Sequence, residues 1–285
     1  MTDTSSEGST RVGSELVAKS ESESSTTSTA TAVMEARDVA LGFGTATIME
    51  DITVSFPKGT VTALVGPSGS GKTTFLRSLN RMNDKVRGFW KRGSILLEDE
   101  EIDGGSLDPL ILRRRVGMVF QRPNPFPMSI QDNVVAGVRA HKMAKRSEYK
   151  DIAETYLAQV GLWARISDRL SDSPFRLSGG QQQLLCLARA LAVEPNVLLL
   201  DEPTSSLDPR STEAVEELVR RLTPELTVII VTHNLAQARR LSDNTIFFYE
   251  GHLIETGPTA DLFERPQRIE TARYLGAEDG PGKSN

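Results

Sequence analysis

A glycine-rich stretch between a short apolar run and a helix pattern carries the clearest chemistry of this sequence. After Val61–Val65 the chain continues with Gly66, Pro67, Ser68, Gly69, Ser70, Gly71, Lys72, Thr73 and Thr74. The glycines allow successive backbone N–H groups to point inward, and the positive end of the following helix completes an anion cradle. We expect Lys72 to reach the β- and γ-phosphates of a nucleotide, and Thr73 to place its hydroxyl on Mg²⁺. A chance glycine loop is the alternative, and the flanking strand and helix patterns argue against it.

Two adjacent carboxylates follow a second apolar run. Val197–Leu200 reads as a strand buried on both faces, and Asp201 and Glu202 come directly after it. Ligands bind beyond the carboxyl ends of parallel strands, where the phosphate loop also lies. We expect Asp201 to hold Mg²⁺ through water. Glu202 would polarise the water that attacks the γ-phosphate, a contribution of roughly 10²–10⁴ in rate. The alternative is an acidic strand end that faces solvent.

Further polar residues follow two other predicted strands. His233 comes after Val228–Val231 and could sense the γ-phosphate, although such a histidine is often only an N-terminal helix residue. Gln121 comes after Val116–Phe120, and by itself this position is uninformative.

A second helix start also combines serine with glycines. Ser178, Gly179, Gly180 and Gln181 open the helix pattern that continues to Leu191. They predict a second anion site, and an ordinary glycine N-cap is the equally weighted alternative. Ser178 lies 106 residues after Lys72 (178 − 72), beyond a helical segment. One monomer cannot easily bring both helix starts to one nucleotide, whereas two monomers in a head-to-tail arrangement can.

Composition narrows the class of protein. The chain has 285 residues and a net charge of −5 (33 basic minus 38 acidic), which argues against a general nucleic-acid binder. No apolar run approaches the roughly 18 residues that a membrane span needs. If the protein works at a membrane, we expect another subunit to span it. The single cysteine, Cys186, fits core packing in a reducing compartment.

The element patterns predict an α/β fold with a mostly parallel sheet. Residues 1–33 are rich in serine and threonine and are expected to be a disordered tail. Residues 34–276 would form one domain that begins with alternating antiparallel strands, and 277–285 a frayed C-terminus. A helical insertion is expected at about 128–177, after the proline-rich connector Arg122–Pro127.

In this order the motifs resemble those of ABC-transporter ATPase subunits, over about Ala36–Gly276. The resemblance implies the P-loop ABC ATPase fold with ATP as ligand, and it adds Ser206-Leu207-Asp208 to the motifs. It implies that Ser178 and Gly180 contact the γ-phosphate held by a partner subunit, and that Asp208 lies across the interface of a homodimer. Phe43 would stack on adenine, and Gln121 and His233 would join the catalytic and metal site.

A narrower similarity points to the ATPases of inorganic phosphate importers, the PstB type, and to actinobacterial members in particular. It rests on Phe120–Ile130, on Asn80–Asn83 and on Gln181–Gln183. Leu184 departs from this pattern, because most of the family has arginine or lysine there.

The resemblance implies a peripheral protein at the cytoplasmic face of the cell membrane. Its partners would be two polytopic permease subunits and an extracytoplasmic phosphate-binding protein. The groove beside Gln121 and the proline tract would receive a permease helix. An importer ATPase for another solute, such as an amino acid or phosphonate, shares the same catalytic motifs and remains an alternative. A soluble ABC ATPase that acts on DNA or ribosomes is a further one, although this acidic chain has no basic arm or second ATPase unit.

Overall fold

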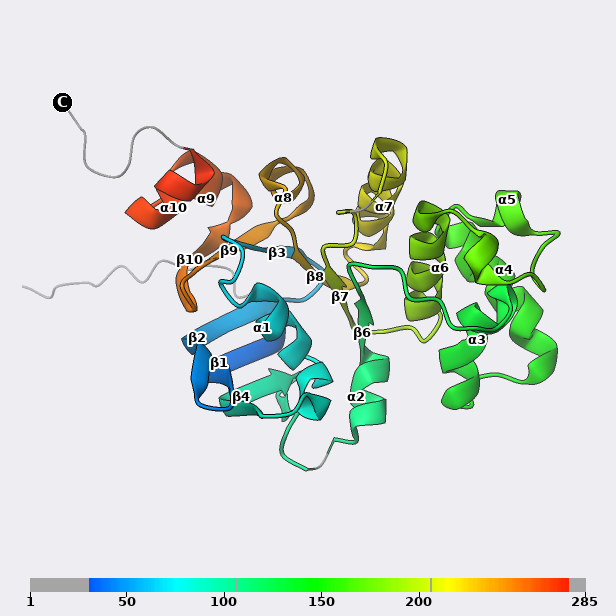
Figure 1. Ribbon diagram of the computed structural model, residues 1–285, viewed down its shortest axis with the longest axis horizontal. Helices are drawn as coiled ribbons and strands as arrows, with labels where there is room; N and C mark the ends of the chain where they lie inside the picture. The colour runs from blue at the N-terminus through cyan, green and yellow to red at the C-terminus, as the bar shows by residue number, and fades with distance from the viewer. Residues whose placement is uncertain (1–30, 106, 206, 277–285) are drawn as a thin grey trace, which may run out of the picture.

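The computed structural model describes residues 31–105, 107–205 and 207–276, and its first strands form an antiparallel sheet (Figure 1). In the order β2-β1-β4-β5, these strands are β1 (Ala32–Phe43), β2 (Ala46–Pro57), β4 (Phe89–Leu97) and β5 (Glu100–Glu101). Ile52, Val54 and Phe56 are all buried while the residues between them are exposed, as the alternation in the sequence predicts.

The boundaries of the expected domain are only partly covered. The predicted tail falls on residues 1–30, and the predicted C-terminal segment on 277–285; both lie outside the described residues. β1 begins at Ala32, two residues before the expected start of the domain at Met34. Val33 is 2% exposed and packs in the core, so the apolar side chain draws this residue into the sheet.

A six-stranded sheet forms the centre of the molecule and positions the phosphate loop. In the order β10-β9-β3-β8-β7-β6, its strands are β3 (Val61–Val65), β6 (Val116–Val119), β7 (Val197–Asp201), β8 (Thr227–Val231), β9 (Asn244–Tyr249) and β10 (His252–Pro258). β3 pairs in parallel with β8 and β9, and β7 pairs in parallel with β6 and β8. β10 returns antiparallel to β9 around Gly251. The expectation of a mostly parallel sheet with an antiparallel part is confirmed.

Helices cover both faces of this central sheet or stand beside it (Figure 1). They are α1 (Lys72–Ser78), α2 (Pro109–Arg115), α3 (Ile130–Ala140), α4 (Tyr149–Gln159), α5 (Trp163–Ile166), α6 (Gly179–Leu191), α7 (Pro209–Leu222), α8 (Leu235–Leu241), α9 (Thr259–Glu264) and α10 (Ile269–Leu275), with short 3-10 turns η1 (Met82–Lys85), η2 (Arg146–Glu148) and η3 (Pro174–Arg176). Within the described ranges, none of these helices has the length and apolarity needed to cross a membrane.

Two separate cores explain why the central strands are apolar without alternation. Leu198 and Leu200 pack with the residues of α6, α7 and α8, whereas Leu199 packs with α1 and the antiparallel sheet. Figure 1 shows α7 and α8 on one side of the central strands, and α1 with β1 and β2 on the other. Every residue of β7 is therefore buried, and the strand carries Asp201 and Glu202 to a fixed edge of the sheet.

The helices between β6 and α6 stand to one side of the central sheet (Figure 1). α3 packs against both α4 and α6, which closes this group of helices. The buried side-chain amide of Asn133 holds the proline tract where the chain enters this group of helices. The Asn133 side chain accepts a hydrogen bond from Phe126 N–H at 2.7 Å and donates to the carbonyls of Phe126, Met128 and Ser129. The tract is thus a rigid connector between Gln121 and the helical group.

Candidate nucleotide-binding and catalytic site

The phosphate loop runs from the end of β3 to the start of α1, and two of its glycines are sterically required. Gly66 has a φ of 143°, and a Cβ there would meet the Phe248 carbonyl oxygen at 2.0 Å. Gly71 has a φ of 93°, and its Cβ would meet the Met49 side chain at 2.4 Å. Any other residue would push the loop away from the sheet. The tight turn that the sequence predicts therefore rests on contacts with distant strands.

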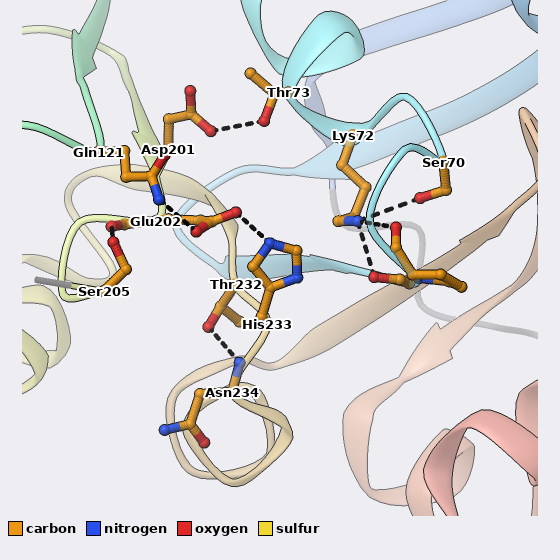
Figure 2. A network of polar contacts seen from close by, with 12 residues as sticks. Ser70, Lys72, Thr73, Gln121, Asp201, Glu202, Ser205, Thr232, His233 and Asn234 are labelled. Atoms are coloured by element: carbon orange, nitrogen blue, oxygen red, sulfur yellow. Dashed lines mark hydrogen bonds and ion pairs between the residues drawn. The ribbon is translucent and has the colours of Figure 1, made fainter.

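Lys72 is the most enclosed charged group of the loop. Its Nζ donates to the carbonyl oxygens of Gly66 at 2.8 Å and Pro67 at 2.7 Å, and to Ser70 Oγ at 3.2 Å (Figure 2). Burial lowers the pKa of the amine from its usual 10.5, and the nearby Glu202 carboxylate raises it in opposition. The ammonium is thus held by oxygen acceptors inside the loop, where a phosphate would also find it.

Asp201 meets the phosphate loop directly across 128 residues of sequence. Thr73 Oγ1 donates to Asp201 Oδ1 at 2.9 Å, and Arg77 Nη2 donates to Asp201 Oδ2 at 3.0 Å. The hydroxyl and the carboxylate offer oxygen ligands, which Mg²⁺ prefers, so the predicted pair fits this ion. Sequence reasoning missed Arg77. Its position one helical turn after Thr73 places both side chains on one face of α1 and was the available signal.

His233 and Gln121 both contact the Glu202 carboxylate, although the three residues come from three different strand ends. One Glu202 oxygen pairs with His233 Nε2, and the other accepts from Gln121 Nε2 at 2.9 Å. Figure 2 shows the three side chains facing one another beside the phosphate loop. Glu202 has a φ of 46°, uncommon for a residue with a side chain, and its N–H donates to the Val231 carbonyl at 3.0 Å. The backbone thus turns this carboxylate toward the loop.

A cavity of about 260 Å³ lies between these two groups of residues. It is lined by Ile48, Ser68, Gly69, Gly71, Lys72, Thr73, Thr74, Glu202 and His233. The loop therefore faces the candidate base and the histidine across one open space. Within the described part of the chain, the lining includes neither Phe43 nor any of residues 178–181.

The second glycine-rich helix start, Ser178–Gln181, lies beside the N-terminus of α7 and not beside the phosphate loop. Ser178 caps α6, accepting from Gln181 N–H at 3.3 Å, while Gln181 Oε1 accepts from Ser178 N–H at 3.0 Å. A Cβ on Gly180 would lie 2.6 Å from Ser211 Oγ and 3.9 Å from Asp208 Oδ2. Asp208 caps α7, and hydrogen bonds from Ser211 hold the pKa of this carboxyl below its usual value. Residues 178–181 and Asp208 thus form a second group, separate from the phosphate-loop cavity.

Two other positions singled out in the sequence differ in exposure: Phe43 is partly exposed and Leu184 is buried. Phe43 ends β1, is partly exposed, and its ring centroid lies 5.5 Å from that of Phe89. Leu184, where the resemblance leads us to expect a basic residue, is 8% exposed and packs in the core.

Comparisons with known proteins show the family of this chain. The family model described as ABC transporter matches residues 49–205. A phosphate import ATP-binding protein PstB of Mycobacterium intracellulare is 64% identical over 243 residues, covering 85% of each chain. Phosphate import ATP-binding protein PstB 2 of Mycobacterium tuberculosis strain H37Rv is 59% identical over 254 residues, covering 89% of this chain and 92% of that protein.

Solved structures give the same fold. CbiO1 from Clostridium perfringens, part of the ABC transporter complex cbiONQ, matches with a TM-score of 0.71 and 25% identity, over 87% of this chain and 95% of that chain. A bacterial Atm1-family ABC exporter with ATP bound also matches with a TM-score of 0.71 and 25% identity, over 88% of this chain and 42% of that one. The chain therefore belongs to the ABC transporter family, as one of its ATP-binding proteins, and the relatives it resembles over most of its length are phosphate import ATP-binding proteins.

Proposed function

We propose that this chain is the ATP-hydrolysing subunit of an importer of inorganic phosphate. The observation that carries the catalytic part is the cavity in which Lys72 and Thr73 face Glu202 and His233. The substrate part is supported by the names of the relatives that match most of the chain. Phosphate selectivity would belong to a permease and an extracytoplasmic phosphate-binding protein, and this chain would meet phosphate only as a product of ATP.

The loop residues Gly66–Thr74 would bind the triphosphate through backbone N–H groups and the Lys72 ammonium. Thr73 and Asp201 would hold Mg²⁺, which neutralises charge on the phosphate oxygens when bound. Glu202 would take a proton from the attacking water, since its carboxylate faces the cavity. His233 and Gln121, both in contact with this carboxylate, would orient it toward the γ-phosphate. Phe43, at the end of β1, would stack on the adenine ring, as an aromatic side chain can.

A homodimer would complete each site. Residues 178–181 are absent from the described lining of the phosphate-loop cavity, yet they form a serine-glycine helix start of the kind that binds anions. In a head-to-tail dimer, Ser178 and Gly180 of one subunit would meet the γ-phosphate of the other. Asp208, which lies beside Gly180, would then sit at the same interface. Hydrolysis removes this bridging group and would open the dimer.

A groove beside the proline tract is the candidate contact for the membrane permease. It has a cavity of about 230 Å³ lined in part by Leu110, Phe126, Arg113, Arg114 and Arg189. Leu110 is 64% exposed and Phe126 41% exposed. The apolar groups with three arginines suit a helix that has an apolar face and acidic flanks. Such docking would place the chain at the cytoplasmic face of the membrane.

Two measurements test the proposal. The first is phosphate uptake by vesicles that contain co-purified permease subunits and this chain, with an amino acid and a phosphonate as competing solutes. ATP-dependent uptake of phosphate supports the substrate; uptake of another solute alone would replace it. The second is the dependence of specific ATPase activity on protein concentration, which should rise as dimers form. Ser178→Arg should reduce hydrolysis while monomers still bind ATP, and a monomer with full activity would rule out shared sites.

A further inference from the structure

A buried glutamine behind the candidate catalytic residues makes a set of contacts that the mechanism above does not use. Gln237, on α8, is 1% exposed. Its Oε1 accepts from Thr232 Oγ1 at 2.7 Å, and its Nε2 donates to Thr204 Oγ1 at 3.0 Å and to Glu216 Oε1 at 3.1 Å. Both donors and the acceptor of this amide are thus engaged, which fixes the orientation of the group.

The three partners of Gln237 come from three segments that meet near the carboxyl ends of β7 and β8, where Glu202 and His233 lie. Thr204 lies two residues after Glu202, in the loop that leaves β7. Thr232 directly precedes His233, and its Oγ1 also accepts from Asn234 N–H at 3.0 Å (Figure 2). Glu216 lies on α7, the helix that Asp208 caps. One side chain therefore connects the loops that hold the candidate base and the histidine to the helix at the expected dimer interface.

The charge of Glu216 is compensated inside this group. Glu216 is 4% exposed, and Arg240 Nη2 donates to its two carboxylate oxygens at 2.9 and 3.2 Å. Arg220 Nη2 lies 3.8 Å from Oε2. A buried carboxylate with a cation and an amide donor is a rigid anchor, because each partner would be costly to lose. A cavity of about 520 Å³ is lined by Glu216 and Arg240 as well as by Glu202 and His233, so the anchor reaches the space that the carboxylate faces.

We propose that Gln237 is a positioning residue for hydrolysis, which holds the Glu202 loop and the His233 loop at one spacing by anchoring both to Glu216 of α7. The inference rests on the roles proposed above for Glu202 and His233. The side-chain hydrogen bonds of Gln237 go to Thr232, Thr204 and Glu216 and not to these two residues, so it acts through Thr204 and Thr232. Its effect should appear in the rate of hydrolysis and not in the affinity for ATP, because no phosphate-loop residue is among its partners.

An exchange of amide and carboxylate tests this arrangement. Gln237→Glu alone replaces the donor with a carboxylate at the 3.1 Å contact with Glu216, so two like charges would face each other. The pair Glu216→Gln with Gln237→Glu restores one amide and one carboxylate. The NH2 group of the new amide at position 216 can donate to the carboxylate at position 237, while its carbonyl oxygen still accepts from Arg240, which in the wild type donates to both oxygens of Glu216. Both threonine hydroxyls can rotate to donate. A misplacement of the base near 1 Å costs up to about 100-fold in rate. We therefore expect Gln237→Glu to lower kcat per folded site about 10–100-fold, with the Kd for ATP changed less than about twofold, and the double variant to recover at least tenfold.

A cycle with His233→Ala separates positioning from general stabilisation. If Gln237 acts through the two loops, Gln237→Glu should cost much less in the His233→Ala background than in the wild type. Thr259→Val is the matched control, since it removes buried hydrogen bonds to Thr245 at 2.9 Å and Ser242 at 3.0 Å in another cluster. It should lower the melting temperature and leave kcat per folded site unchanged.

Several outcomes would overturn the inference. One is a Gln237→Glu variant that melts early but keeps its kcat per folded site, as Thr259→Val should. Others are a double variant as slow as Gln237→Glu alone, or equal losses in both His233 backgrounds. Glu202→Gln and His233→Ala, measured in the same series, report separately on the proposed function: if both turn over ATP like the wild type, the assigned roles fail whatever Gln237 does.

Discussion

Replacing Glu202 by glutamine tests the proposed chemistry with the smallest change in shape. The Glu202 side chain is 12% exposed and touches Gln121 and His233. A glutamine there can still accept from the Gln121 amide through its carbonyl, and its own amide can donate to a neutral His233 imidazole. The fold of the edge and the binding of ATP should therefore persist. What is lost is the capacity to accept a proton from water.

The size of the loss follows from this role. A positioned general base contributes roughly 10²–10⁴ in rate, which corresponds to about 2.7–5.5 kcal/mol of activation free energy. Glu202→Gln should lower kcat by that factor and change the Kd for ATP less than about threefold, because the Lys72 and Thr73 side of the cavity is untouched. The variant should also accumulate as an ATP-bound dimer, since the bridging phosphate is no longer removed.

Release of inorganic phosphate under single-turnover conditions measures the chemical step, calorimetry measures the affinity, and size-exclusion chromatography with ATP measures the dimer. Glu213→Gln is the matched control: this exposed carboxylate on α7 lines the neighbouring 520 Å³ cavity and has no assigned role in hydrolysis. Single-turnover phosphate release by Glu202→Gln within threefold of the wild type would refute the assignment of Glu202 as the base.

Three further expectations concern other parts of the structure. Lys72→Ala should weaken ATP binding about 10–100-fold in calorimetry, since it removes a charge-assisted contact of about 1.5–3 kcal/mol; unchanged affinity would contradict the cradle. Arg77→Met removes the cation from buried Asp201, but Arg77 is 41% exposed, so the cost is about 1–2 kcal/mol, or about 2–8 °C in Tm. Burial and the Glu194 contact raise the pKa of Tyr156 from 10.0 to about 12, so the stability it contributes is fully present below pH 10 and is lost toward pH 12. The unfolding free energy of Tyr156→Phe should fall less steeply in that interval during denaturant titrations, and parallel curves would exclude the effect.

Much of the fold was predictable from local pattern. The unbroken apolar runs Val197–Leu200 and Val228–Val231 required strands covered on both faces, and the two cores on either side of β7 confirm this. The alternation around Ile52 likewise predicted the half-buried strand β2. Strand lengths depended on tertiary pairing: β4 runs from Phe89 to Leu97 through the charged residues Lys91 and Arg92, because it pairs with β1 along this whole length.

The sequence by itself also determined which residue types stand at the strand ends. A glycine loop after β3, two carboxylates at the end of β7 and a histidine after β8 must meet at one edge, because parallel strands end together. The side-chain partners were decided only by the tertiary structure. Thr73 and Asp201 are 128 residues apart, Gln121 and Glu202 are 81 apart, and Gln237 and Thr204 are 33 apart. Local spacing specifies the direction of a side chain from its own strand or helix. The packing of strands and helices from distant parts of the chain then selects which atoms come within hydrogen-bonding distance, so the contact of Arg77 with Asp201 and the partners of Gln237 became visible only in the folded molecule.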